Sequence, residues 1–161
     1  MSLTRWLRSK TASPVVASSN TTWRADAGDE TQLGVSRGSR VARVRNLLKL
    51  ADKPVVLDDI TVSTERFKRI DEDTFRSREG TIYGLYQARY GVNVVRINER
   101  LSAAHPPADI AAILGMRANQ PALHIRRIAY TYNDSPVEHR LSWINSADHE
   151  YLSDLWKTAA R

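Results

Sequence analysis

Residues 121–143 read PALHIRRIAYTYNDSPVEHRLSW. Two runs rich in Ile, Tyr, Val and Trp flank Asn133–Pro136, whose residues favour turns through side-chain hydrogen bonds to the backbone and through the fixed φ of proline. The stretch therefore predicts a β-hairpin. A two-residue loop inside this turn would place Glu138 opposite Thr131, so that polar side chains lie within a ladder of large apolar ones.

The same layout occurs 81 residues earlier in the chain. Leu33-Gly34 leads to Val41 and the stretch VARVRNLLKLADKPVVLDDITV, as Leu114-Gly115 leads to Ala122 and the hairpin above. Each copy predicts a short helix, a strand, a turn ending in Pro-Val and a returning strand. The alternative is a chance match, because Leu-Gly is a common helix ending; a true repeat constrains the whole fold. Further strands are expected before each copy, at residues 15–24 and 94–105.

Between the two halves, residues 64–91 predict a helical insertion, in which Thr81 caps a helix that ends at Gly91. Asp26 can cap another short helix, and Pro107 can open a third. Six strands and about four short helices predict an α+β domain with an antiparallel sheet. The expected boundaries are a linker or stub at 1–13, the domain at 14–157 with a closing helix at 147–160, and a tail at 158–161.

Composition narrows the chemistry. The chain has 161 residues, 42% of them apolar, and no cysteine, which excludes disulfides and thiol catalysis. The four histidines lack metal-ligand spacing, so we expect neither a metal nor a cofactor. No apolar run approaches the ~20 residues of a membrane span, and no secretory signal is recognisable. We therefore expect a cytoplasmic protein that does not contact a membrane.

The net charge of +6 raises the question of nucleic-acid binding, because clustered Lys and Arg neutralise phosphates. The arginines are scattered, however, mostly beside turns and helix ends. A solvated basic surface is the favoured interpretation, with no specific binding of duplex DNA by this chain.

Residues 41–50 alternate between apolar and polar side chains, which places Arg45 and Lys49 on one face of a strand. A two-residue turn at 52–53 would put Asp58 opposite Leu47 and diagonal to both cations. The group is either a salt bridge on a wet face or the floor of a ligand pocket. A capped helix start at Thr81 offers free N–H groups to an anion, although most such starts bind only water.

Three spaced motifs carry a resemblance to a known family. They are Leu-Gly-x6-Val followed by Leu-Ala-Asp-x-Pro-Val, then Thr-Ile-Tyr-x-Leu-x4-Tyr-Gly-Val, then Ala-x-Leu-x-Ile-x-Arg-x-Ala-Tyr-x-Tyr-x-x-Ser-Pro-Val-Glu. Together they resemble the UTRA domain, the chorismate lyase-like effector-binding half of bacterial GntR regulators of the HutC subfamily. The resemblance covers about residues 14–155.

The resemblance implies a set of ligand contacts, and neither Lys49 nor Glu138 among them is expected to support the core. Two positions depart from the pattern of sugar-phosphate-binding members, because Leu47 replaces an arginine and Ile144 a tyrosine. The expected effector is therefore a small anionic or polyhydroxy metabolite. With two arginines of the predicted strands added, the ligand-binding set is Arg45, Lys49, Asp58, Thr81, Tyr83, Arg126 and Glu138.

The resemblance also implies a function. The chain would sense an effector and modulate DNA binding by an N-terminal winged helix absent from these residues; we expect a homodimer, since bacterial operators are commonly palindromic. Two alternatives stay open. One is a cofactor-free lyase of the chorismate lyase type, and the other is a dimerisation or interaction domain without a ligand.

Overall fold

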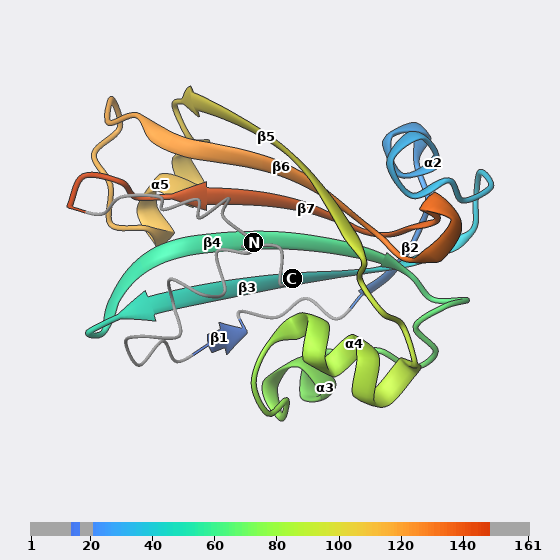
Figure 1. Ribbon diagram of the computed structural model, residues 1–161. Helices are drawn as coiled ribbons and strands as arrows, with labels where there is room; N and C mark the ends of the chain where they lie inside the picture. The colour runs from blue at the N-terminus through green and yellow to red at the C-terminus, as the bar shows by residue number, and fades with distance from the viewer. Residues whose placement is uncertain (1–13, 17–20, 149–161) are drawn as a thin grey trace, which may run out of the picture.

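A computed structural model of the chain describes residues 14–16 and 21–148 (Figure 1). The predicted linker at 1–13 and nearly all of the predicted closing helix lie outside the described residues. In chain order the elements are β1 (Pro14–Val16), β2 (Thr21–Arg24), α2 (Ala27–Leu33), β3 (Arg40–Leu50), β4 (Lys53–Ser63), α3 (Glu72–Arg76), α4 (Ile82–Tyr90), β5 (Arg96–Ala104), α5 (Ala108–Ile113), β6 (Ala122–Tyr130), the 3-10 turn η1 (Tyr132–Asp134) and β7 (Pro136–Ile144).

The strands form one antiparallel sheet in the order β1-β3-β4-β7-β6-β5, with β2 also pairing with β3. Because β1 and β2 pair with different parts of β3, the seven described strands occupy six positions across the sheet. The first half of the chain supplies β1 to β4 and the second half supplies β5 to β7, and the halves meet where β4 pairs with β7. This arrangement confirms the predicted α+β class and antiparallel sheet.

The first hairpin, β3–β4, differs from the predicted register by one residue. Its two turn residues both have positive φ, 48° and 63°, and the turn begins one residue earlier than expected, which alone would shift the pairing by two residues. A β-bulge next to the turn, between Leu48 and Lys49, shifts the pairing back by one. Asp58 therefore lies opposite Asn46 instead of Leu47, and Asp59 takes the place opposite Arg45. Because successive side chains point to opposite faces of a sheet, the one-residue shift removes Asp58 from the face of Arg45.

The second hairpin, β6–β7, differs from the predicted register by two residues. Glu138 lies opposite Ala129 instead of Thr131, because the connection at residues 131–135 is longer than a two-residue loop and contains η1. The Thr131 N–H closes this connection by donating to the Ser135 carbonyl at 2.9 Å. A shift of two residues preserves the face of every side chain, so the predicted polar and apolar faces of β7 survive the correction.

The helix boundaries follow the predicted capping signals. Asp26 caps α2 through a reciprocal capping box, and the Thr81 hydroxyl accepts a hydrogen bond of 3.0 Å from the first turn of α4. Gly34 and Gly91 end these helices with φ of 62° and 64°, a conformation that costs glycine little. Pro107 directly precedes α5.

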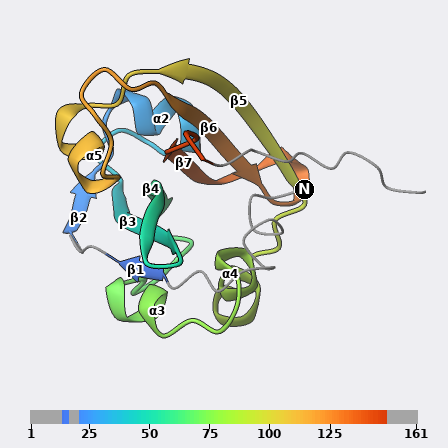
Figure 2. The ribbon, with the colours of Figure 1, turned by 90° about the vertical axis from the view of Figure 1, so that its left-hand side faces the viewer.

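The two faces of the sheet are covered by different helices (Figure 2). On what we call the α4 face, side chains of the sheet pack against α3, α4 and their connections: Ala42, Val44, Ile60, Val62 and Ala129 meet Phe67, Ile70, Phe75, Ile82 and Tyr86. On what we call the α5 face, Leu47, Leu57, Ala122 and Trp143 meet Ile110, Ala111, Ile113 and Leu114. The insertion between the halves therefore covers one face, and the second half's own helix covers part of the other.

Candidate functional site

Strands β4 and β7 bring polar side chains together on the α4 face, at the junction of the two halves. Their register pairs Asp58 with Ser142 and Ile60 with Arg140. Glu138, two residues before Arg140, points to the same face, and each of the four polar residues is at most 8% exposed. With polar residues of neighbouring elements they form what we call the buried charge cluster: Asn46, Asp58, Arg78, Tyr83, Tyr86, Glu99, Arg127, Glu138, Arg140 and Ser142.

Arg140 lies at the centre of this cluster. Its Nε and Nη2 donate to the two carboxylate oxygens of Glu138 at 2.9 and 2.8 Å, and its Nη1 lies 3.7 Å from Asp58 Oδ2. Burial alone would raise the pKa of Glu138, but the charge and hydrogen bonds of Arg140, with the Tyr86 hydrogen bond and the charge of Arg127, outweigh burial and lower that pKa below its ordinary value. Burial alone would lower the pKa of Arg140, but Glu138 holds it well above the usual value. Both groups are therefore charged.

Two tyrosines of α4 complete the surroundings of Glu138. The Tyr86 hydroxyl donates to Glu138 Oε2 at 2.6 Å, and the Tyr83 hydroxyl donates to Oε1 at 3.3 Å. Burial, followed by the nearby Glu138 charge, raises the pKa of Tyr83 to about 12 and the pKa of Tyr86 still more strongly. Both hydroxyls therefore remain protonated donors.

A second ion pair flanks the cluster on the side of β5. Arg127 lies opposite Arg140 in the β6–β7 register and is 1% exposed. Its Nε donates to Glu99 Oε1 at 2.7 Å, and its Nη1 donates to the Tyr83 hydroxyl at 3.4 Å. Two like charges can face each other on adjacent strands here because each has its own carboxylate.

A third arginine, Arg78, lies on the other flank of the cluster and has different hydrogen-bond partners. Its Nη1 donates to the Phe75 carbonyl and its Nη2 donates to Asn46 Oδ1 at 3.4 Å. Its buried Nε has no hydrogen-bond partner, and among the described residues no carboxylate forms an ion pair with it. Burial, followed by the charge of Arg140, lowers the pKa of Arg78. Asp58, the carboxylate whose charge acts on Arg78, is held by Ser142 at 2.5 Å and by the Asn46 amide at 3.3 Å.

The structure separates the seven residues predicted to bind a ligand. Asp58, Tyr83 and Glu138 belong to the buried charge cluster, and Thr81 caps the start of α4 beside Tyr83. Lys49 lies beyond a β-bulge at the end of the β3–β4 hairpin, opposite Pro54.

The remaining two predicted residues, Arg45 and Arg126, lie on the α5 face. Arg45 forms a bidentate pair with Asp59, at 2.7 and 3.0 Å. Arg126 is exposed and lies opposite Arg100 of β5. Arg45, predicted to share one pocket with Asp58 and Lys49, therefore lies on the far side of the sheet from Asp58.

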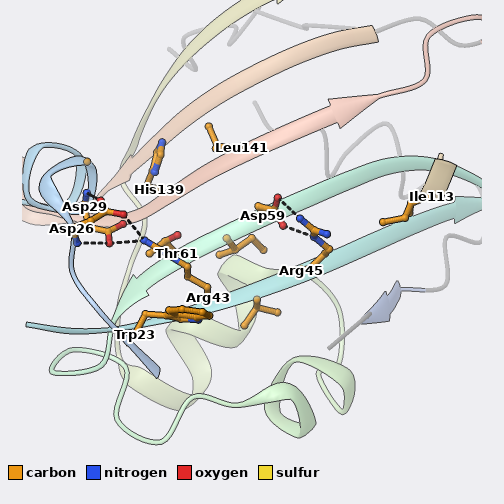
Figure 3. Close-up of a pocket in the computed structure, with 13 residues that line it drawn as sticks. Trp23, Asp26, Asp29, Arg43, Arg45, Asp59, Thr61, Ile113, His139 and Leu141 are labelled. Carbon is orange, nitrogen blue, oxygen red and sulfur yellow. Dashed lines mark hydrogen bonds and ion pairs between the residues drawn. The ribbon is translucent and has the colours of Figure 1, made fainter. Parts of the chain in front are cut away.

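The α5 face also holds a cavity of about 590 Å³, between α2 and Ile113 of α5 (Figure 3). Arg43 binds both Asp26 and Asp29 there, at 3.0 and 2.8 Å, and Trp23 lies beside it with 48% of its surface exposed. The charged side chains drawn in this cavity are thus already paired with one another.

Sequence reasoning missed the three arginines of the cluster. Arg140 could have been found, because it follows Glu138 by two residues on a strand and so shares its face. Arg127 could have been found by the same alternation once β6 was aligned with β7. Arg78 lies outside any strand or helix, and no periodicity marks it.

The described residues show no group of three or more His, Asp or Glu arranged to hold a metal ion. None of the described helices is long and apolar enough to span a membrane.

Comparison with known proteins agrees with this fold. The chain is 29% identical to the HTH-type transcriptional repressor PhnF of Mycolicibacterium smegmatis over 110 residues, which is 68% of this chain and 44% of that protein. The ligand-binding domain of a Bordetella bronchiseptica protein assigned to the GntR family superposes with a TM-score of 0.83 at 29% identity, covering 90% of this chain and 91% of that one.

The effector domain of PhnF from Mycobacterium smegmatis shares the fold, with a TM-score of 0.82 at 22% identity over 97% of this chain and 95% of that one. The chain spans less than half the length of the curated repressor that it matches. The sequence profile of the UTRA domain matches residues 2–150, and the chain belongs to the UTRA domain family.

Proposed function

We propose that the chain is the effector-sensing domain of a GntR regulator of the HutC type, and that the buried charge cluster binds the effector. Membership of the UTRA family and the likeness to a ligand-binding domain at 29% identity support this proposal. A winged-helix domain elsewhere in the natural protein would bind DNA, in the cytoplasm, and effector binding would change the geometry of two such domains in a homodimer.

The observation that carries the proposal is the environment of Arg78. A cation that is largely removed from water normally acquires a carboxylate partner, because an uncompensated buried charge is costly. Arg78 has instead a backbone carbonyl, a distant amide and a buried Nε without a partner. It lies three residues before Thr81, where the start of α4 adds the positive end of a helix dipole. An anionic group of the effector would supply the missing partner.

The rest of the cluster suits the remainder of a small polar molecule. The carboxylates of Asp58 and Glu138 accept hydrogen bonds, so they can orient hydroxyl or ammonium groups of a ligand. The Tyr83 hydroxyl is a neutral donor that already bridges Glu138 and Arg127. We therefore propose an effector with one anionic group and several hydroxyls or an amine. Such a ligand would replace weak contacts, at 3.3 to 3.4 Å, with stronger ones.

We also propose that the domain is not an enzyme. Ser142, the hydroxyl closest to a carboxylate in the cluster, donates to Asp58, and no histidine of the described residues hydrogen-bonds to it as a base. A lyase of the chorismate lyase type remains the second candidate, because it would need no cofactor. The two functions differ in one measurement, since a lyase consumes its ligand and a sensor returns it unchanged.

The test is a thermal-shift screen of the 161-residue chain against sugar phosphates, amino sugars, amino acids and dicarboxylates. Binding to the folded state raises the melting temperature, and calorimetry then gives the affinity. We expect Arg78→Ala to lower the affinity for the selected ligand at least tenfold, since a charge-assisted hydrogen bond contributes about 1.5–3 kcal/mol.

Arg89→Ala is the matched control, because Arg89 is exposed on α4. Equal affinity in Arg78→Ala and Arg89→Ala would contradict the assignment of the anion site. If chromatography shows that the ligand is consumed with time, this result would favour the lyase.

A further inference from the structure

Strand β5 forms one edge of the sheet, and nothing among the described residues pairs with its outer side (Figure 1). It pairs with β6 through nine consecutive residue pairs, without a bulge. It contains no proline and no lysine, the residues that most often protect an edge from pairing. The opposite edge carries only the three residues of β1 and the four of β2. An edge as long and regular as β5 is a template for another strand.

On the C-terminal side of the exposed Arg100, the exposed side chains of β5 are small or apolar. Leu101 is 47% exposed, and Ser102 and Ala103 beside it are also exposed. The one acidic residue of the strand, Glu99, is already neutralised by Arg127. The centre of the edge therefore presents no uncompensated negative charge to an approaching strand.

We propose that β5 pairs antiparallel with β5 of a second copy, with Leu101 opposite Leu101 of the partner subunit. This inference rests on the proposed homodimer and names the surface that forms it. A two-fold axis between the two leucines would join both sheets into one continuous sheet and keep the α4 faces of the two copies on the same side.

The charges of β5 disfavour the two registers centred on the residues just before Leu101. In a two-fold antiparallel pair one residue lies opposite itself, and directly opposed side chains are about 4.5–5.5 Å apart at Cβ. Centring the pair on Arg100 opposes two arginines, with Arg126 adding more positive charge from β6. Centring it on Glu99 opposes two carboxylates. Centring it on Leu101 opposes two apolar side chains and places Arg100 opposite the partner's Ser102 and Glu99 opposite the partner's Ala103.

The register also connects the interface to the buried charge cluster. Glu99 belongs to β5 and binds Arg127, whose Nη1 donates to Tyr83. A ligand that displaces Tyr83 or reorients Arg127 therefore acts on a side chain of the interface strand itself. This contact provides a physical route from the effector site to the second copy.

The chain has no cysteine, so single-cysteine variants report the register without background. Under mild oxidation we expect Leu101→Cys to form a disulfide-linked dimer, because the two Cα atoms of a directly opposed antiparallel pair lie about 4.5–5.5 Å apart, within the range that a disulfide spans. Ser102→Cys would place the thiols on the diagonal, about 7–8 Å apart, and should link poorly. Tyr132→Cys, at a side chain 62% exposed in the η1 turn, reports random collision.

Light scattering provides the second measurement, and it separates this inference from the proposed homodimer. We expect Leu101→Arg to weaken the dimer at least tenfold and to leave the melting curve of the monomer unchanged. Val95→Arg lies outside the paired segment and should not weaken the dimer. A dimer that persists in Leu101→Arg, or a Leu101→Cys yield no higher than that of Tyr132→Cys, would overturn the β5 interface and leave a homodimer through another surface. Preferential linking of Ser102→Cys would overturn the register, and an 18.2 kDa species at all micromolar concentrations would overturn both.

Discussion

Glu138→Gln tests whether the buried charge cluster supports the fold as well as a ligand. Glu138 is 0% exposed and accepts hydrogen bonds from Arg140 at 2.9 and 2.8 Å and from Tyr86 at 2.6 Å. This burial contradicts the sequence-based expectation that the residue does not support the core. The glutamine variant keeps the shape of the side chain and removes its charge, so the buried Arg140 retains Asp58, at 3.7 Å, as its one carboxylate partner among the described residues.

The expected loss of stability is large for a single isosteric change. Removing one partner of a buried ion pair costs about 3–5 kcal/mol, because the other charge stays buried without compensation. The glutamine amide can still accept one hydrogen bond, so we take the lower end, about 3 kcal/mol. At roughly 2–4 °C per kcal/mol for a chain of this size, the melting temperature should fall by about 6–12 °C.

The pH dependence supplies a second signature. The pKa of Glu138 is lowered in the folded protein, so its contribution to stability is fully present above its ordinary value of 4.5 and is lost as the pH falls through the lowered folded value. The difference in unfolding free energy between wild type and Glu138→Gln should therefore become smaller below pH 4.5. Urea unfolding at a series of pH values measures this difference.

The control is Asp134→Asn, which removes an exposed carboxylate from Arg96 and should leave the melting temperature unchanged. Adding Arg140→Met to Glu138→Gln should recover part of the lost stability, because the variant removes the unpaired cation. Equal melting temperatures for Glu138→Gln and Asp134→Asn at pH 7 would refute the reasoning, and so would a difference that does not depend on pH.

Three further predictions concern Tyr83, the Arg45–Asp59 ion pair and the binding of duplex DNA. Tyr83→Phe should remove a tyrosinate absorbance step near pH 12 and cost about 1–2 kcal/mol of unfolding free energy, because the hydroxyl's hydrogen bonds to Glu138 and from Arg127 are lost. An unchanged alkaline titration would contradict the burial of this hydroxyl. Asp59→Asn should change the urea midpoint little, since Arg45 and Asp59 are both about one-third exposed and such pairs contribute about 0–1 kcal/mol. Fluorescence anisotropy should show no sequence-dependent binding of duplex DNA by residues 1–161; discrimination between operators would oppose the assignment of DNA binding to another domain.

The sequence predicted the element order better than the strand register. The repeat of Leu-Gly and Pro-Val correctly indicated two halves, and the caps at Asp26 and Thr81 correctly indicated helix starts. The predicted positions of the hairpin turns were wrong because they depend on backbone conformations that composition does not reveal. Ala51 and Asp52 both adopt positive φ, which is uncommon for residues other than glycine.

The two register errors had unequal consequences for the candidate site. The one-residue error in the first hairpin placed Asp58 on the wrong face, beside Arg45, whereas the two-residue error in the second left Glu138 on the correct face. Alternation along β6 and β7 places Arg127 and Arg140 on the face of Glu138, but it does not show that a helical insertion will bury that face. Arg78, in particular, gains its role only from the packing of that insertion on the sheet.

Arg140 also helps to explain why the two halves of the chain fold as one unit. It belongs to the second half of the chain, while Asp58, one of its two carboxylates, belongs to the first half, and β4 and β7 meet through six residue pairs at this point. A polypeptide consisting of the first half alone would expose Asp58 and the apolar side of β4, and the second half alone would expose Arg140 beside an unpaired strand. Separately expressed halves should therefore be insoluble or disordered alone and gain structure on mixing, so that the smallest unit able to fold is the pair of halves.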